Sequence, residues 1–264
     1  MKKAAFIGTG NMGGALVRAA CKAISADQVV VTNRTFAKAA ALAAEVGCQI
    51  VKTNREAVLD AAYIFLCVKP KLIGGVLEEL RDLLEGKVVV SVAAGVVLAD
   101  LERMAGEGVP VIRLMPNTPC SIGMGMTAMV AGTSAKEQHL TDVKNVLAMT
   151  GRLEQIDESL MDAFSAVAGC GPAFIYPYIE ALADGGVAAG LPRAQALRYA
   201  AQMTLGSAAM VLETGKHPGE LKDAVCSPGG STIAGVAELE RSGLRAAAID
   251  AVLAAWKRNG ELGR

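Results

Sequence analysis

Apolar runs and helical patterns alternate along the first part of the chain. Short runs rich in β-branched and aromatic residues begin at positions 4, 28, 62, 87 and 109, and helical patterns separate them. A strand, a helix and a further strand are then predicted over residues 125–156. Strands that are apolar throughout and alternate with helices are typical of a parallel sheet covered on both faces. We therefore expect residues 1–156 to form an α/β domain with a doubly wound, mostly parallel sheet.

The strand pattern disappears after residue 156. Residues 157–264 carry long patterns rich in Ala, Leu, Glu and Arg, which glycine and proline interrupt at residues 169–172, 190–192, 217–219 and 227–230. Such clusters stop and start helices. We expect an all-helical second domain over residues 157–264.

Two of these predicted helices, over residues 174–191 and 198–213, are small or apolar nearly all the way round. A helix of that kind is buried on every side. A domain of about a hundred residues cannot easily bury several such helices by itself. The pattern therefore favours a homodimer that forms through the helical domain, and it leaves a larger homo-oligomer open.

Composition narrows the choice of ligand. The 264 residues include 26 Lys or Arg against 26 Asp or Glu, so no basic field is available to hold a nucleic acid or an anionic membrane. No stretch approaches the roughly 20 apolar residues of a membrane span. The apolar residues after the first lysines run into glycines rather than into a signal-peptide cleavage site. We expect a cytoplasmic protein that binds a small molecule and neither nucleic acid nor membrane.

The six cysteines are scattered, without a Cys-x-x-Cys pair, and the chain has only two histidines. This spacing suits neither a disulfide framework nor a zinc site, and it indicates buried thiols in a reducing cytosol. No metal site is predicted. One alternative places magnesium on Glu180 and Asp184, four residues apart on one predicted helix face, but a solvated or capping face fits these residues better.

Residues 8–13 fit the G-x-G-x-x-G pattern, with a predicted strand before them and a predicted helix after them. The glycines allow a tight turn and let the backbone approach a pyrophosphate, whose charge the free amides and the dipole of the helix start stabilise. In this context the pattern predicts a dinucleotide site in a Rossmann-like domain. Its residues are Gly8, Thr9, Gly10, Asn11, Met12 and Gly13.

The end of the second predicted strand distinguishes between cofactors. NAD-binding chains place an acid there, which accepts hydrogen bonds from the ribose 2′-hydroxyl. This chain has Asn33, Arg34 and Thr35 instead. A guanidinium, an amide and a hydroxyl suit a 2′-phosphate, so we expect NADP(H) to be preferred, with NAD(H) also possible. In the alternative interpretation, Arg34 is a solvated residue at the turn into the next helix.

Two later predicted strands end at residues 67–70 and 91–95. Ligands lie at the carboxyl ends of parallel strands, near the point where the strand order reverses. The small residues Ala93, Ala94 and Gly95 leave room there for a flat ring. Lys69 suits acid–base catalysis or a contact with a cofactor phosphate or ribose, and we favour the contact.

A second glycine-rich helix start, with the sequence SPGGSTIAG, follows at residues 227–235. The amides of residues 229–233 form a concavity that could receive an anion. Because one such site is enough for a dinucleotide, we interpret the second anion as a substrate carboxylate. The alternative is a simple helix cap after a proline turn, with Ser231 as the capping residue.

Several segments together resemble the pyrroline-5-carboxylate reductase family over nearly the whole chain. They are FIGTGNMG, CVKP, SVAAGV, RLMPNTP, GPA, LADGGVAAGLPR and the long, specific run HPGELKDAVCSPGGSTIAGVAELERSGLRAA. The resemblance implies an NAD(P)H-dependent reductase that makes L-proline from its cyclic imine, with a Rossmann domain followed by a helical dimerisation domain. One departure is Cys170, where the family often has serine; a thiol is a weaker hydrogen-bond donor than a hydroxyl.

The resemblance also assigns individual residues. Besides the first glycine loop and Asn33, it implies cofactor contacts at Asn54, Cys67, Val68, Lys69 and Pro70. It implies substrate contacts at Ser227, Ser231 and Thr232, to which we add Gly229 and Gly230 as parts of the anion-binding loop. A protonated cyclic imine is already an electrophile, so its reduction requires little more than positioning. We expect the Thr232 hydroxyl to form a hydrogen bond with the imine nitrogen and thus to act as the catalytic residue.

Two other functions remain open. A β-hydroxyacid dehydrogenase shares this domain arrangement, but it needs a lysine general base on a helix of the second domain. Lys216, Lys222 and Lys257 have no suitable neighbouring motif there. A non-catalytic NADP-sensing protein would bind the cofactor without turnover. Oxidation of NADPH in the presence of the imine separates all three functions.

Overall fold

The computed structural model describes residues 3–262, which form two compact units. One unit contains the residues up to Gly169 together with those from Trp256 on. The other unit is Cys170–Ala255.

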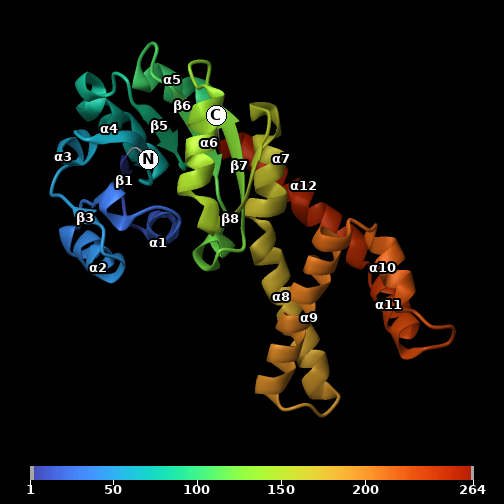
Figure 1. Ribbon diagram of the computed structural model, residues 1–264. Coiled ribbons are helices and arrows are strands. Elements are labelled where there is room, and N and C mark those ends of the chain that lie inside the picture. The colour runs from blue at the N-terminus through green and yellow to red at the C-terminus, as the bar shows by residue number, and fades with distance from the viewer. Residues whose placement is uncertain (1–2, 263–264) are drawn as a thin grey trace. The chain divides into compact units, whose positions relative to one another are not determined.

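The first unit is built around a sheet with the strand order β3-β2-β1-β4-β5-β6-β7-β8 (Figure 1). The strands are β1 (Lys3–Ile7), β2 (Val29–Thr32), β3 (Gln49–Ile50), β4 (Ala61–Leu66), β5 (Val88–Ser91), β6 (Val111–Met115), β7 (Gly125–Ala131) and β8 (Gly151–Gln155). Neighbouring strands are parallel except for the antiparallel pair β6 and β7. The strand order reverses between β1 and β4, which confirms the predicted doubly wound, mostly parallel sheet.

Helices cover both faces of this sheet. One core involves α1 (Asn11–Ala23), α2 (Phe36–Val46) and α6 (Glu137–Val146), and the other involves α3 (Asn54–Val58), α4 (Ile73–Leu80) and α5 (Leu98–Ala105). Successive strand residues serve opposite cores, because side chains alternate across a strand. In β1, Phe6 belongs to the first core and Ile7 to the second. Burial on both faces explains why these strands appear in the sequence as continuous apolar runs.

Two short elements and one strand direction differ from the sequence interpretation. Neither β3 nor α3 was predicted, because a strand of two residues and a helix of five show no measurable period. A capping box starts α3, in which Thr53 Oγ1 accepts from the Glu56 amide and the Glu56 carboxylate accepts from the Thr53 amide. An apolar run does not show in which direction its strand crosses the sheet, so the antiparallel direction of β7 was not predicted either.

The first compact unit continues beyond residue 156, where the sequence changes from strand to helix. It includes α7 (Met161–Phe164) and a π-helical turn (Ser165–Gly169). Met161 is buried together with Ala128 and Val130 of β7. The edge of the compact unit therefore lies later than the change in secondary structure, because the first helical turns pack on the sheet.

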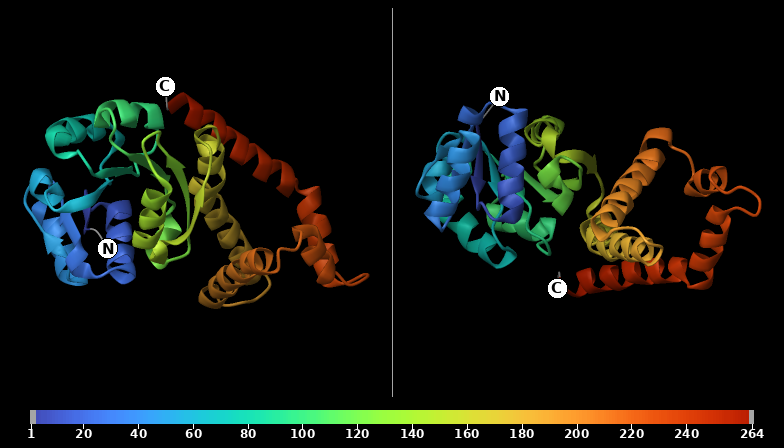
Figure 2. Two further views of the ribbon diagram at one scale, coloured as in Figure 1. Left: turned by 45° about the horizontal axis from the view of Figure 1, so that its top comes forward. Right: turned by 90° about the horizontal axis from the view of Figure 1, so that it is seen from below.

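The second unit is helical, as predicted. It contains α8 (Gly171–Ala188), α9 (Arg193–Thr214), α10 (Pro218–Ala224), α11 (Ser231–Arg241) and the first part of α12 (Leu244–Leu262). Helices α8 and α9 lie side by side (Figure 2) and pack around Ala183, Ala196 and Ala200. Many large apolar side chains are exposed, for example Leu212 at 59%. Among the helices of the described chain, none has the length and apolar character that a membrane crossing requires.

Candidate cofactor and substrate sites

The loop between β1 and α1 and the first turn of α1 are packed so tightly that Gly8 and Gly13 cannot carry a side chain. Gly8 has φ of 100°, and a Cβ added there would lie 2.8 Å from the Cys67 carbonyl oxygen. A Cβ on Gly13 would lie 2.1 Å from the Gly8 carbonyl oxygen. Gly10 is the N-cap of α1, and no side-chain hydrogen bond caps that helix within the described residues. The amides of the first turn are therefore available to an anion.

A pocket of about 640 Å³, the larger pocket, opens at the carboxyl ends of β1, β2 and β4. The predicted cofactor residues that line it are Gly8, Gly10, Asn33, Arg34, Thr35, Asn54, Cys67, Val68 and Lys69. Pro70 and Ala94 line a second, smaller pocket. The remaining predicted residues line neither pocket: Thr9, Asn11, Met12 and Gly13 lie in the loop and the first turn of α1, and Ala93 is buried.

Positive charge gathers in the larger pocket. Arg34, Lys38, Lys52 and Lys69 line it together with a single carboxylate, Glu79, among the described residues. A chain with equal numbers of basic and acidic residues has thus concentrated cations at this place. Such a pocket attracts a ligand that carries several phosphate charges.

Two asparagines tie the walls of the larger pocket together. Asn33 Oδ1 accepts from the Thr9 amide at 3.4 Å, and Asn33 Nδ2 donates to the Thr35 carbonyl oxygen at 3.1 Å. Asn54 Nδ2 donates to Glu79 Oε2 at 2.8 Å. The Thr35 carbonyl oxygen and the Glu79 carboxylate can only accept, so the two bonds from Nδ2 identify the nitrogen of each amide. The other end, Oδ1, is the acceptor.

The groups present fit a dinucleotide. Thr9 Oγ1 is buried and has no hydrogen-bond partner within residues 3–262. A buried hydroxyl in that condition is costly unless a ligand satisfies it. Together with the glycine cradle and the surrounding cations, this unsatisfied hydroxyl supports a bound phosphate at the loop.

Cys67 lies beside the glycine loop but is not poised as a nucleophile. Burial raises the pKa of its thiol to about 12. The thiol therefore stays protonated at neutral pH, whereas a nucleophilic cysteine needs the thiolate. The contact of its backbone with Gly8 gives Cys67 a structural reason to be there.

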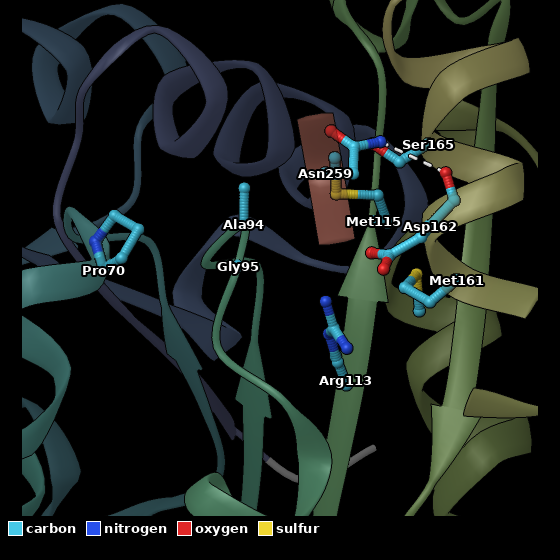
Figure 3. A pocket seen from close by; sticks show the side chains of 9 residues that line it. All are labelled: Pro70, Ala94, Gly95, Arg113, Met115, Met161, Asp162, Ser165 and Asn259. Carbon is cyan, nitrogen blue, oxygen red and sulfur yellow. Dashed lines mark hydrogen bonds between the residues drawn. The ribbon is translucent and has the colours of Figure 1, made fainter. Parts of the chain in front are cut away.

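The smaller pocket, of about 320 Å³, adjoins the carboxyl ends of β5 and β6 (Figure 3). Its lining residues are Pro70, Ala94, Gly95, Arg113, Met115, Met161, Asp162, Ser165 and Asn259. Arg113 is buried and forms an ion pair with Glu158, whose Oε1 also accepts from the Leu98 amide at 2.9 Å. This pairing holds the start of α5 and the turn before α7 against the end of β6.

The predicted substrate loop lies in the second unit. Gly229 has φ of 65°, the left-handed conformation that favours glycine, and Gly230 is the N-cap of α11. No side-chain hydrogen bond caps α11 in the described chain. Ser231 is the first helical residue, so the alternative in which Ser231 caps the helix is wrong. The side chains of Ser227, Ser231 and Thr232 are exposed.

The structure adds site residues that the sequence interpretation missed. They are Lys38, Lys52 and Glu79 in the larger pocket, and Arg113, Asp162 and Asn259 in the smaller one. Lys38 could have been found, because it lies in the first turn of the helix that follows Arg34. Lys52 follows the unpredicted strand β3, and Asn259 is remote in sequence from everything that it meets.

One of the two carboxylates considered for magnesium has a cationic partner in the structure. Asp184 forms an ion pair with Arg193. Within the described residues, no cluster of three or more His, Cys, Asp or Glu side chains could hold a metal ion.

Comparisons with known proteins agree with this architecture. The family model described as pyrroline-5-carboxylate reductase dimerisation matches residues 158–262, and the model described as NADP oxidoreductase, coenzyme F420-dependent, matches residues 3–95. Pyrroline-5-carboxylate reductase from pea (Pisum sativum) is 42% identical over 260 residues, which cover 97% of this chain and 94% of that protein.

Solved structures extend the likeness to three dimensions. A pyrroline-5-carboxylate reductase from Coxiella burnetii superposes with a TM-score of 0.94 at 32% identity, over 100% of this chain and 99% of its own. The Plasmodium falciparum pyrroline carboxylate reductase with NADP bound has a TM-score of 0.87 at 29% identity, over 100% and 98% of the two chains. The glycine cradle, the cationic pocket and the full-length similarity lead to one assignment: the chain belongs to the pyrroline-5-carboxylate reductase family.

Proposed function

We propose that this chain reduces 1-pyrroline-5-carboxylate to L-proline, with NADPH as the hydride donor. The observation that carries the proposal is the similarity to pyrroline-5-carboxylate reductases over the whole chain, which includes both glycine-rich helix starts. The β-hydroxyacid dehydrogenase and sensor alternatives have no comparable support.

The larger pocket supports NADP(H) as the preferred cofactor, with NAD(H) possible. Arg34 and its neighbours Lys38 and Lys52 would hold the 2′-phosphate, and the loop from Gly8 to the first turn of α1 would hold the pyrophosphate. A guanidinium pairs with a phosphate in a strong, charge-assisted hydrogen bond. The hydroxyl of NAD(H) offers no charge to these three cations.

The bound cofactor would supply the hydride, and the protein residues would position and polarise the imine. The amides that start α11 receive the substrate carboxylate, because they are uncapped and carry the positive end of the helix dipole. The Thr232 hydroxyl oxygen accepts a hydrogen bond from the N–H of the protonated imine and so fixes the position of the ring. The exposed side chains of Ser227, in the loop, and Ser231, at the first position of α11, would add hydrogen bonds to the carboxylate.

We also propose that two copies of the chain form a homodimer through the helical unit. Apart from the small alanine core, large apolar side chains along α8, α9 and α12 are exposed in the single chain. An exposed apolar surface of that extent marks an interaction site. Association into a larger homo-oligomer is compatible with the same surface. Free thiols at all six cysteine positions support a reducing cytoplasm.

The test is an assay in which the purified chain is mixed with NADPH and the cyclic imine and the NADPH absorbance is followed. We expect proline to form in an amount equal to the NADPH consumed. Parallel reactions contain NADP⁺ with β-hydroxy acids. Turnover of a hydroxy acid alone would point to the dehydrogenase, and cofactor binding without turnover of either substrate class would point to the sensor.

A further inference from the structure

The last turns of α12 contribute a polar side chain to the smaller pocket. Asn259 lies among the α12 residues that belong to the first unit, and its Nδ2 donates to the carbonyl oxygen of Asp162 at 3.1 Å. The two residues are 97 positions apart in the chain. The Asn259 carboxamide lines the smaller pocket, as Figure 3 shows.

The bond to Asp162 determines how the amide is oriented. A backbone carbonyl oxygen can only accept, so the end of the Asn259 side chain that meets it must be the nitrogen. Oδ1 is then directed away from Asp162 (Figure 3). Asn259 therefore presents a hydrogen-bond acceptor with a fixed direction to the smaller pocket.

The helical segment that Asn259 contacts, α7 with the turn after it, is held by a second asparagine. The π-helical turn Ser165–Gly169 follows α7 directly, and Asn117 Nδ2 donates to its Ala168 carbonyl oxygen at 3.0 Å. Turns of this kind often mark functional sites. Asn259 thus holds α7 at Asp162, and Asn117 holds the π-helical turn at Ala168. Ser165, which lies between these two positions in the sequence, lines the pocket.

Two consecutive residues line different pockets. Lys69 lines the larger pocket and Pro70 lines the smaller one. A dinucleotide with its pyrophosphate on the glycine loop would therefore place its nicotinamide past Pro70, beside Ala94 and Gly95. A volume of about 320 Å³ has room for that ring and its carboxamide.

We propose that Asn259 Oδ1 accepts a hydrogen bond from the carboxamide N–H of the nicotinamide and so sets the orientation of the ring. The proposal rests on the NADPH-dependent function proposed above. The carboxamide N–H needs an acceptor, and Pro70, Ala94, Met115 and Met161 bring no polar side-chain group apart from thioether sulfur. The side chains of Asp162 and Ser165 are the competing acceptors on the same wall, and the test distinguishes them.

The experiment compares equilibrium binding of NADP⁺ with that of its 3-acetylpyridine analogue, in which a methyl ketone replaces the carboxamide and removes the N–H donor. Calorimetric titration of the full chain should show NADP⁺ bound about tenfold more tightly than the analogue, the scale of one hydrogen bond. In Asn259→Leu the two ligands should bind about equally, because only NADP⁺ loses a partner. Lys257→Ala, an exposed neighbour on the same helix, should keep the wild-type ratio.

Three outcomes would overturn the proposal. The first is an unchanged ratio in Asn259→Leu with both affinities unchanged, and the second is an unchanged ratio with both affinities weakened equally. The third is an unchanged ratio in Asn259→Leu together with a ratio lost in Asp162→Ala or Ser165→Ala, which would assign the acceptor to that residue. Asn259→Ala replaces the leucine variant if thermal unfolding shows that the larger side chain disturbs the fold. Because the readout is binding, an imine that is not turned over by the wild-type chain would refute the proposed reaction without changing these titrations.

Discussion

The two glycine-rich helix starts of this chain differ in what surrounds them. At the first, between β1 and α1, backbone atoms of Gly8 and Cys67 occupy the space that side chains on Gly13 and Gly8 would need. At the second, before α11, the atoms nearest to a Cβ on Gly230 belong to Ser227, with Oγ at 2.3 Å and the carbonyl oxygen at 3.2 Å. The first loop is thus enclosed by backbone, whereas the second is exposed, and the nearest obstacle at Gly230 is a residue of the same loop.

This difference teaches that one sequence pattern can serve two physical purposes. Backbone packing confines the enclosed loop, which suits a cofactor that every turnover uses. The exposed loop offers its amides with few neighbours in the single chain. We expect substitutions at Gly8 or Gly13 to damage the fold and cofactor binding together, and substitutions at the second loop to damage only the handling of the substrate.

Gly13→Ala should have the largest effect, because its Cβ would lie 2.1 Å from the Gly8 carbonyl oxygen. We expect NADP⁺ binding to weaken by at least about hundredfold and the free energy of unfolding to fall by about 1–3 kcal/mol. Calorimetry and denaturant unfolding measure the two effects. Gly10→Ala is the matched control for stability, since an added Cβ meets nothing within 4 Å among the described residues and φ is −70°. An equal loss of stability in both variants would contradict the packing argument.

Thr232→Ala tests the residue of the second helix start that we place next to the imine nitrogen. We expect the turnover number to fall by roughly one to two orders of magnitude, with a smaller change in the Michaelis constant of the imine, because the lost hydrogen bond strengthens in the transition state. Steady-state kinetics at saturating NADPH measure both constants. Ser242→Ala, at the other end of the same helix, should behave like the wild type. Unchanged turnover in Thr232→Ala would reduce this loop to a helix start and leave the substrate site unlocated.

Arg34→Ala sharpens the comparison from the cofactor side. The Michaelis constant for NADPH should rise by about tenfold, because a charge-assisted hydrogen bond to the 2′-phosphate contributes on the order of 1.5 kcal/mol. The constant for NADH should hardly change. Arg103→Ala removes an exposed arginine that does not line the larger pocket and serves as the control. Equal effects on NADPH and NADH would show that Arg34 does not read the phosphate.

Gly230→Ala should have the smallest effect, and it tests how the second loop is confined. We expect the Michaelis constant of the imine to rise by a few fold, roughly 0.5–1 kcal/mol, while the free energy of unfolding stays near that of the wild type. The obstacle is mainly the Ser227 hydroxyl, so the same change made in a Ser227→Ala background should cost less. A loss of stability as large as that of Gly13→Ala would mean that the two loops are alike.

The sequence predicted the parts of the molecule that repeat a simple physical rule. β1, β2, β4, β5 and β6 are buried on both faces, and so they appear as nearly continuous apolar runs, which Arg113 interrupts in β6. The first glycine loop was predictable because few other patterns place glycine at those spacings between a strand and a helix. The family resemblance then connected the remaining motifs.

What the sequence did not predict depends on contacts between distant positions. Lys52 lines the larger pocket only because the two-residue strand β3 pairs with β2. Asn259 meets Asp162 only because the end of α12 belongs to the first unit, and a helical pattern does not say where its last turn packs. Whether the predicted residues Asn54 and Pro70 touch the cofactor stays a prediction, which ligand titrations can test.

The alanine contact between α8 and α9 has a consequence for how the second unit becomes stable. The buried residues of this contact are the alanines Ala183, Ala196 and Ala200, and the larger side chains Ile179, Leu182 and Val187 are only partly buried against them. The favourable term that offsets the ordering of these long helices is therefore small within one chain. In the proposed homodimer the missing burial comes from a second copy, and folding of this unit becomes a bimolecular event. Its melting temperature then rises with protein concentration, and newly made chains depend on meeting one another before the unit is stable.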